Sequence, residues 1–315
     1  MASHLPPEMI KEILCRLGVK DLLRYRSVCK EWCSIIDGPD FITTHLKHSK
    51  LGLLINGFGS LETPDQLVWV ELDGLEREDS LVRFNQLFEE RASVLGGCNG
   101  LLVVEVDAVK AMAIWNPSTR KYRVLSYNSN SSYRSWVMGF GYDPIYSMKA
   151  KTWRRLDDDF HENYGYNEFD DHVLVNNALH WILTPKLEGH GPFAFIFEFD
   201  LVTEQHREIS MPNFELVEGE MFTYKLDRGS SVVWARLFSV LPSEIIGSVY
   251  HPLQSVEYLV PLAYHKTTDK VLLCINYQRL VVYHLQIKTA KDVRISDIPN
   301  HFEPFLCVNS LVGVD

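Results

Sequence analysis

The 315-residue sequence contains no apolar run long enough to cross a membrane. A transmembrane helix needs about 18 or more consecutive apolar residues, and no segment approaches that length. The opening segment, MASHLPPEMI, lacks both the basic and the apolar stretch of a secretory signal peptide. We therefore expect a protein of the cytoplasm, the nucleus or both, with no membrane partner.

Cysteine and basic residues are also in short supply. Six cysteines are spread thinly, which is typical of free thiols in a reducing compartment rather than of a disulfide framework. The 31 Lys and Arg are outnumbered by 41 Asp and Glu, and the net charge of −10 argues against a nucleic-acid-binding surface. Residues 1–48 hold seven basic and six acidic residues, so the acidic excess lies in the remainder, which holds 24 and 35.

Motifs of catalysis and cofactor binding are missing. No Gly-x-Ser-x-Gly nucleophile elbow occurs, and the glycine-rich GGCNG at 96–100 lacks the Lys-Ser/Thr pair and following helix of a phosphate-binding loop. We expect His180 to be a core or interface histidine, with a catalytic role as the less favoured alternative. The sequence therefore predicts neither catalytic residues nor a cofactor.

Two clusters invite a metal-site hypothesis, which their spacing does not support. Cys29 and Cys33 precede His45 and His48, but the cysteine-pair spacing of zinc modules is absent. The acidic runs at 157–159 and 170–171 lack the spacing and turn glycine of a calcium-binding EF-hand. We expect no metal, and we assign Cys29 to the core of the N-terminal segment.

Residues 1–48 have the pattern of three helices. Apolar residues recur at helical spacing in two neighbouring rows: Met9, Ile13 and Leu17, then Ile10 and Leu14. Pro6 and Pro7 suit a helix start, Gly18 the end of the first helix, and Asp21 the start of the second. The third helix is expected to pass through Trp32 and end at DGPD.

A three-helix unit this short cannot bury all of its own apolar surface. The excess face needs a neighbour. The pattern leaves two possibilities open, namely the protein's own second domain and a separate protein.

From residue 50 the period changes from helix to strand. Three segments share one plan of apolar strand, polar turn and second strand, and their aromatic residues Trp115, Phe199 and Tyr283 are each 84 residues apart. Trp153 and Trp234 lie near the midpoints, so the underlying period is about 42, the length of a four-stranded propeller blade.

The segment 257–296 contains four short apolar strands joined by short polar connectors, as one blade requires. Asn176-Asn177 and Asn99-Gly100 suit the tips of hairpins, and the final FLCVNSLVGV could return to complete the first blade. We predict an α+β two-domain protein, with a helical domain at 1–48 and an all-β, propeller-like domain of about six blades at 50–315.

The helical segment closely resembles the F-box. Its matching residues are the opening Leu5-Pro6, the Glu-Ile-Leu of 12–14, Arg16-Leu17, Leu22-Leu23, Val28-Cys29-Lys30, Trp32 and Pro39-Asp40-Phe41. The resemblance implies that this face docks on a Skp-type adaptor and, through it, on the cullin and RING subunits of an SCF ubiquitin ligase. The adaptor contacts it implies are Leu5, Pro6, Ile10, Ile13, Leu14, Leu17, Leu22, Leu23, Val28, Cys29 and Trp32. Gly18 stands where the family usually has proline, which implies a less rigid loop.

The β segment resembles the F-box-associated interaction domain, a kelch-like domain that follows many plant F-boxes. The matching stretches include GCNGLL, WNPSTRKYRVL, GFGYDP, TWRRL and FDLVTEQHREI. Two blades, near residues 136–156 and 214–240, are shorter than the family pattern. We expect these two blades to lack strands and to expose edges.

The combined resemblance implies a non-catalytic substrate receptor of an SCF-type E3 ubiquitin ligase, which binds a target protein for ubiquitination and proteasomal degradation. Aromatic residues in expected loops are candidates for target binding: Tyr133, Trp136, Tyr164 and Tyr166. Two alternatives are a propeller enzyme with an unrelated helical N-terminus and a glycan-binding propeller in which exposed Trp136 and Trp181 stack on sugar.

Overall fold

The computed structural model describes about two-thirds of the chain and divides into two compact units. The first unit comprises Met1–Gly52, Phe88–Met211 and Cys307–Asp315, and the second comprises Leu53–Leu87 and Pro212–Leu306. The described residues are 5–58, 66–72, 81–84, 92–106, 111–125, 164–165, 173–175, 178–185, 195–211, 221–228, 232–246, 256, 258–265, 268–293, 295 and 300–314. Among them, no helix combines the length and the apolar character needed to span a membrane.

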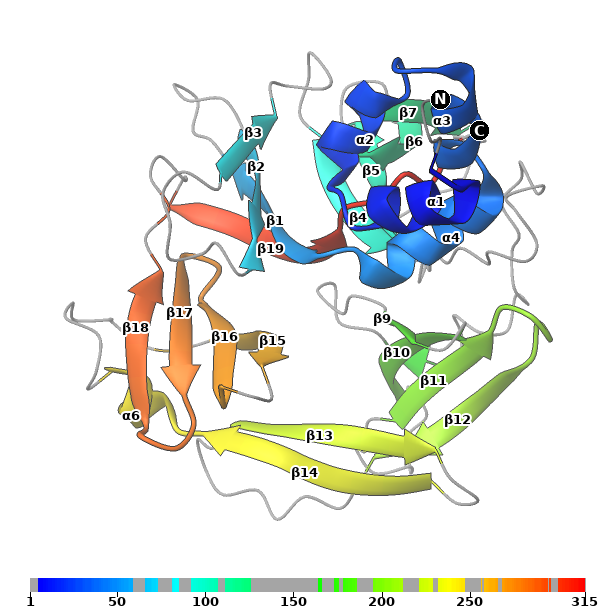
Figure 1. Ribbon diagram of the computed structural model, residues 1–315. Coiled ribbons are helices and arrows are strands. Elements are labelled where there is room, and N and C mark those ends of the chain that lie inside the picture. The colour runs from blue at the N-terminus through cyan, green and yellow to red at the C-terminus, as the bar shows by residue number, and fades with distance from the viewer. Residues whose placement is uncertain are drawn as a thin grey trace. The chain divides into compact units, whose positions relative to one another are not determined.

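The N-terminal segment folds into four helices, not the predicted three (Figure 1). They are α1 (Pro7–Cys15), α2 (Val19–Tyr25), α3 (Lys30–Ile36) and α4 (Pro39–His48). The DGPD sequence ends α3 as expected, but Pro39 also begins α4, because proline at the first position of a helix loses no hydrogen bond. The change from helix to strand falls between His48 and Leu51, where the sequence places it, while the domain boundary at 48–50 stays a prediction.

Gly18 has a different role from the one predicted. α1 ends at Cys15, and Gly18 is the residue that caps the start of α2, with φ −70° and ψ 155°. Its carbonyl oxygen accepts from the backbone N–H groups of Asp21 and Leu22 at 3.1 and 3.0 Å. Asp21 therefore lies in the first turn of α2 and does not cap it, although its charge still suits the positive end of the helix.

The two neighbouring apolar rows of α1 differ in burial. Leu14 is fully buried against Leu22, Ile36 and Phe41, and Ile10 packs on the same cluster. The Met9–Ile13 row is exposed. The helical core is thus small, and a large part of the apolar surface of the helices remains outside it.

The remainder is all-β, in antiparallel sheets. Three sheets are four-stranded, and the strand bounds follow below; their orders are β19-β1-β2-β3, β4-β5-β6-β7 and β15-β16-β17-β18. In a fourth sheet, β10 pairs with β11, which pairs with β12, along one edge and with both β8 and β9 along the other. Among the described strands, β13 pairs only with β14. The strands are β1 (Leu51–Phe58), β2 (Gln66–Glu71), β3 (Leu81–Phe84), β4 (Ala92–Cys98), β5 (Leu101–Val106), β6 (Ala111–Asn116), β7 (Lys121–Leu125), β8 (Tyr164–Gly165), β9 (Val173–Val175), β10 (Ala178–Pro185), β11 (Phe195–Asp200), β12 (His206–Ser210), β13 (Met221–Arg228), β14 (Val232–Val240), β15 (Leu259–His265), β16 (Lys270–Ile275), β17 (Arg279–His284), β18 (Thr289–Val293) and β19 (His301–Val308). A short helix, α6 (Pro242–Ile246), follows β14.

The 84-residue repeat predicted from the sequence is confirmed at the level of backbone angles. The hairpins β6–β7, β11–β12 and β17–β18 each contain one non-glycine residue in the left-handed region just before the second strand. These residues are Arg120, Glu204 and Lys288, with φ of 58°, 56° and 52°. Because they are also 84 residues apart, the three hairpins are copies of one structural element, as in propeller-like repeats.

Several other strand predictions are confirmed. β19 lies beside β1, so the C-terminal strand completes the first sheet. Asn99 and Gly100, both at positive φ, connect β4 to β5, and β9 pairs with β10 across Asn176-Asn177. The segment 257–296 provides the complete four-stranded sheet β15–β18.

The two predicted short blades have different outcomes. Among the described residues, the sheet near 214–240 has only two strands, β13 and β14, as expected of a shortened blade. The other predicted short blade, at 136–156, lies outside the described residues.

The strand count predicts the pattern of amide hydrogen exchange. Strands β16 and β17 lie inside a four-stranded sheet and carry fully buried residues, including Val271, Leu273 and Val281. Their amides should exchange slowest, whereas those of β13 and β14 should exchange faster, because a two-stranded sheet opens with fewer broken contacts. Hydrogen exchange with mass spectrometry checks this order, and equal protection in both sheets would show that the two-stranded sheet is completed elsewhere.

Replacing Gly18 by proline should stabilise the protein. The glycine already has a proline-like φ of −70°, its amide donates no hydrogen bond to another described residue, and an added side chain would meet open space. Gly18→Pro should therefore raise the free energy of unfolding by about 0.4–1 kcal/mol, by restricting the unfolded chain. Urea unfolding measures this, with Gly18→Ala as the control for loss of glycine freedom alone. A lower stability for the proline variant would contradict the backbone geometry.

Candidate functional site

An apolar row on α1 is exposed to solvent. Leu5, Met9 and Ile13 are 50%, 49% and 49% exposed. Met9 and Ile13 are four residues apart in one helix, so they lie on the same face. A single exposed leucine needs no explanation, but a row at helical spacing on a small unit is typical of a contact surface.

A second apolar group lies where α2 meets α3. The rings of Tyr25 and Trp32 contact edge to face, with centroids 5.8 Å apart and planes at 88°. Tyr25 is exposed and Trp32 half-buried, and Val28 between them is 59% exposed. Cys29 is exposed rather than in the core, contrary to our expectation, because its sulfur caps α3 by accepting from the Trp32 backbone N–H at 3.4 Å.

Not all of the predicted contact residues lie on this surface. Leu14 and Leu22 are fully buried in the helical core, so in this structure they hold the helices together and present nothing to a partner. The others are distributed between exposed positions and half-buried ones; the exposed residues are Leu5, Pro6, Ile13, Val28 and Cys29, and the half-buried residues are Ile10, Leu17, Leu23 and Trp32.

Met9 and Tyr25 are exposed apolar residues that the predicted set omitted. The spacing of Met9 before Ile13 in the sequence could have indicated the first. No signal in the sequence pointed to Tyr25, which is 39% exposed although its ring contacts Trp32. We define the apolar face as Leu5, Met9, Ile13, Tyr25, Val28 and Trp32.

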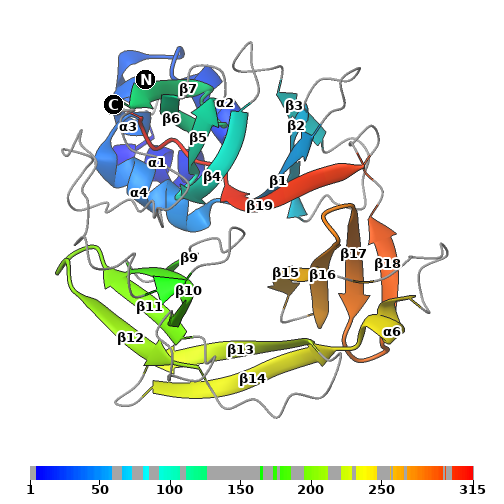
Figure 2. The ribbon, with the colours of Figure 1, turned by 180° about the vertical axis from the view of Figure 1, so that it is seen from behind.

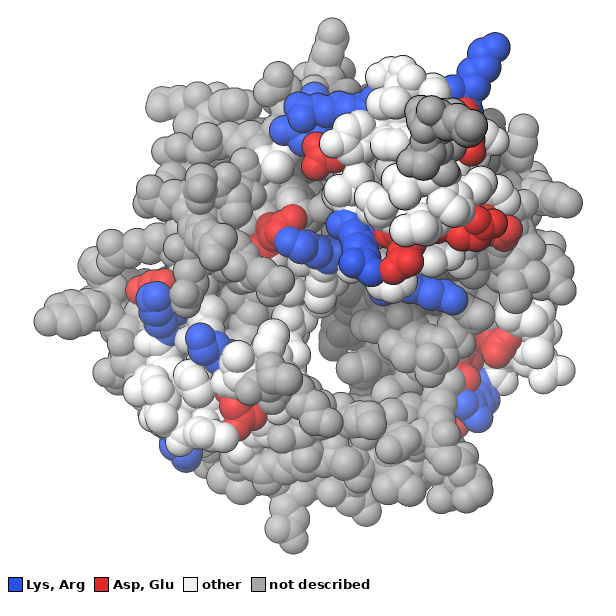
Figure 3. Space-filling view, viewed as in Figure 1, with Lys and Arg blue, Asp and Glu red and all other residues white. Residues whose placement is uncertain are grey.

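Acidic and basic side chains surround an uncharged area over the helices (Figure 3). Arg26, near the end of α2, donates to Asp37, which follows α3, at 2.7 Å, and this hydrogen bond raises the pKa of the Arg26 guanidinium. Two pairs within helices, Glu12 with Arg16 and Asp21 with Arg24, are well exposed. Exposed ion pairs of this kind contribute little to stability.

The residues considered for zinc have separate structural roles. His45 is buried, donates from Nε2 to the backbone oxygen of Leu17 at 2.9 Å and stacks on Phe41. His48 bonds from Nδ1 to the backbone oxygen of Thr44 at 2.9 Å. In the part of the chain that the structure describes, no group of three or more His, Cys, Asp or Glu side chains is arranged to hold a metal.

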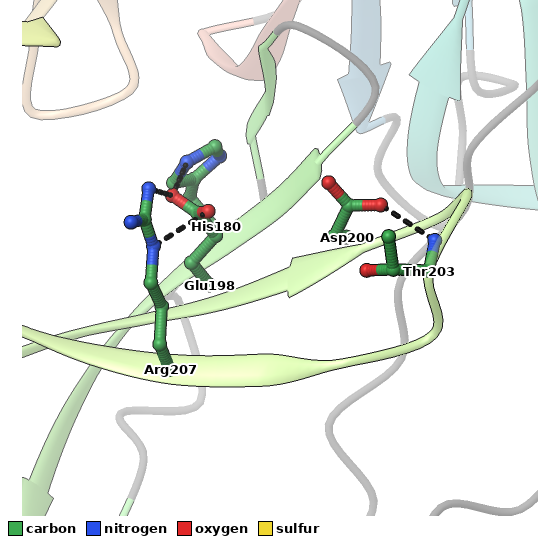
Figure 4. A network of polar contacts seen from close by, with 5 residues as sticks. All are labelled: His180, Glu198, Asp200, Thr203 and Arg207. Atoms are coloured by element: carbon green, nitrogen blue, oxygen red, sulfur yellow. Dashed lines mark hydrogen bonds and ion pairs between the residues drawn. The ribbon is translucent and has the colours of Figure 1, made fainter.

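A polar cluster in the β10–β12 sheet was considered for catalysis (Figure 4). His180 Nε2 lies 3.1 Å from Glu198 Oε2, and Arg207 donates to both carboxylate oxygens at 2.9 and 3.3 Å. Glu198 is buried while Arg207 is half-exposed. The three residues come from three adjacent strands, β10, β11 and β12, so the contacts tie the strands together side to side.

This geometry favours a structural role for His180. The carboxylate is buried and bonded to a guanidinium, which offsets the cost of removing its charge from water. Nearby Asp200 accepts from the backbone N–H groups of Val202 and Thr203, and these bonds, that of Thr203 foremost, lower the pKa of the Asp200 carboxyl. Asp200 therefore shapes the β11–β12 turn.

The candidates for target binding lie almost entirely outside the described residues. Tyr133, Trp136 and Tyr166 are not described, and Tyr164 is described only as part of β8. Trp181, considered for stacking on sugar as an exposed residue, is only 6% exposed and packs against Phe197 with ring centroids 5.9 Å apart. That part of the glycan-binding alternative is wrong.

Comparison with known proteins gives the helical segment a family. Residues 2–44 match the F-box domain, which is therefore present at the N-terminus. The chain is 27% identical to F-box protein CPR1 of Arabidopsis thaliana, over 98% of this chain and 89% of the relative. It is 26% identical to F-box protein At4g22390 of the same organism, over 98% and 90%, and 25% identical to putative F-box/kelch-repeat protein At3g17570, over 67% and 60%.

The alignments also bear on chain length. The match to CPR1 extends over 389 residues, whereas this chain has 315, so at least 74 aligned positions have no counterpart here (389 minus 315). The relative thus contains segments, within the shared region, that this chain lacks. That difference agrees with the two-stranded sheet β13–β14.

The polar cluster yields a prediction about stability. Glu198→Ala should lower the free energy of unfolding by about 1–3 kcal/mol, because half-buried His180 would lose its carboxylate partner and Arg207 its ion pair. Val202→Ala, at a 49% exposed turn position of the same hairpin, serves as the control and should change stability by less than about 0.5 kcal/mol. Urea unfolding followed by circular dichroism measures both. Parental stability in the Glu198 variant would show that the cluster does not stabilise the fold.

Proposed function

We propose that this chain, with its N-terminal F-box, is the substrate-recognition subunit of an SCF-type E3 ubiquitin ligase. The F-box binds a Skp-type adaptor and thereby the cullin and RING subunits. The β region holds a target protein, which is ubiquitinated and then degraded by the proteasome. We place this activity in the cytoplasm, the nucleus or both.

The observation that supports the proposal most directly is the exposed apolar face on α1, α2 and α3. Burying an apolar side chain of this size is worth about 1.5–3 kcal/mol, so covering several of them supplies much of the free energy of a stable complex. The face also contains Tyr25 and Trp32, and these two residue types are enriched among those that dominate binding energy. An apolar partner surface is the occupant that such a face requires.

The proposed role is positional. The chain holds its target close to the ubiquitin-charged enzyme recruited by the complex, so the gain in rate comes from proximity, and the bond chemistry is supplied by other subunits. The acidic excess outside residues 1–48 favours a target with a basic surface. Tyr133, Trp136, Tyr164 and Tyr166 remain our proposed target-binding residues.

Adaptor binding tests the proposal. Ile13→Asp places a charge in the exposed α1 row without touching the helical core, and it should weaken binding of a Skp-type adaptor by at least about 30-fold, the loss expected at a binding hot spot. Leu5→Ala with Pro6→Ala should also weaken binding. The matched control is Ile287→Asp, because Ile287 is 64% exposed and lies in the turn after β17.

Binding is measured with purified full-length protein and adaptor, by titration calorimetry or pull-down. Circular dichroism verifies that each variant is folded. Parental affinity in folded Ile13→Asp and in the Leu5/Pro6 double variant would overturn the docking face, and no binding by the parent would overturn the F-box role itself.

A further inference from the structure

The segment 309–314, which follows β19, lies between the F-box helices and the β4–β7 sheet within the first unit (Figures 1 and 2). Leu311 packs on the helical core of Leu14, Leu22, Ile36 and Phe41. A residue that is 270 positions away from Phe41 in sequence (311 minus 41) therefore completes the F-box core.

The next residues of the segment belong to the core of the sheet. Val312 and Val314 are buried in one cluster with Leu101, Val103 and Ile114 of β5 and β6. Ile42 and Leu46 of α4 pack against the same cluster. The helices and the sheet thus share apolar contacts through this segment and also directly.

Polar contacts fix the segment to the sheet. Asn116, fully buried at the end of β6, donates from Nδ2 to the backbone oxygens of Ser310 and Val312 at 3.1 and 2.8 Å. Its Oδ1 accepts from the backbone N–H groups of Ser118 and Thr119 at 2.8 and 3.1 Å. One side chain therefore shapes the β6–β7 turn and holds the segment at the same time.

Comparison with the equivalent hairpin separates the segment-binding role of Asn116 from its turn-capping role. Asp200 occupies the equivalent position 84 residues later and caps its own turn through the same two types of bond. A carboxylate could not donate to backbone carbonyls, so only the asparagine can both cap the turn and bind the segment. Among the described residues, Asn116 is the member of the pair that bonds to a partner outside its hairpin.

The backbone of the segment also requires a glycine opposite it. Gly100 has φ +80°, and a Cβ there would lie 2.3 Å from Ser310 Cβ and 2.6 Å from the backbone oxygen of Val308. Ser118 adds two more contacts, donating to Asn309 Oδ1 and accepting from the Ser310 backbone N–H, both at 3.1 Å. The segment is therefore held on its apolar side and along its backbone.

We propose that residues 309–314 act as a clasp that joins the F-box to the β4–β7 sheet as one body. The clasp fixes the orientation of the apolar face relative to that sheet. This role in ubiquitin transfer rests on the proposed function. An adaptor bound to the F-box is then held at a constant orientation to the sheet, and residues 309–314 and Asn116 are positioning residues for ubiquitin transfer.

Hydrogen exchange of the full-length chain tests the clasp with a matched pair of variants. Asn116→Asp keeps the turn-capping oxygen but replaces the donor by a carboxylate facing two carbonyls, whereas Asp200→Asn makes the reverse change at the equivalent turn. In Asn116→Asp, amides of 310–314 and of α4 should exchange faster by about tenfold or more, because the contacts that protect these segments from local opening are lost. In Asp200→Asn these amides should exchange at the parental rate.

A second variant tests the contacts between the clasp and the helices. Leu311→Ala removes apolar contacts with the F-box core, and it should speed exchange in β5 and β6 as well as in α1 to α4. Parental exchange of the helices in Asn116→Asp, or of the strands in Leu311→Ala, would overturn the proposal, because two independent bodies would not transmit either change. The measurement needs no adaptor, so failure of the clasp and failure of adaptor binding are distinguishable.

Discussion

The structure of the first unit depends on one constraint, which is that the N-terminal helices have more apolar surface than they can bury among themselves. Two different solutions are used on different sides. The side formed by α4 and the Leu14 cluster is covered by the chain itself, through Leu311 and the residues of β5 and β6 that cluster with Val312. The α1 row and the Tyr25–Trp32 corner are left uncovered. Of the two possibilities left open by the sequence pattern, cover by the protein's own β region is found on one side, and cover by a separate protein is what we propose for the other.

The parts of the fold that could be predicted are those encoded by local patterns. The 84-residue spacing of Trp115, Phe199 and Tyr283 was sufficient to locate three equivalent hairpins, because strand period and turn chemistry are local properties. The complete sheet at 257–296, the return of β19 to β1 and the two-stranded sheet near 214–240 followed from the same reasoning. The fourth helix was missed because Pro39 was taken only as a stop, although proline also suits a helix start.

The parts that could not be predicted depend on contacts between distant residues. The spacing in α1 yields two apolar rows but does not say which one faces the core, so the predicted contact set includes Leu14, which is fully buried. Leu22 of α2 is buried with it. The glycan-binding alternative requires an exposed Trp181, and a tryptophan at a strand position gives no indication of what packs over it. The second function of Asn116 could be recognised only once Ser310 and Val312 were seen beside it.

The shared core also constrains the order in which the protein becomes complete during synthesis. The F-box helices leave the ribosome first, but Leu311 is made 270 residues after Phe41, which at about 5–20 residues per second is a delay of roughly 14–54 s. Throughout that interval the helices lack one wall of their core and expose apolar surface on both sides. A nascent chain therefore presents apolar surface that is covered in the finished protein.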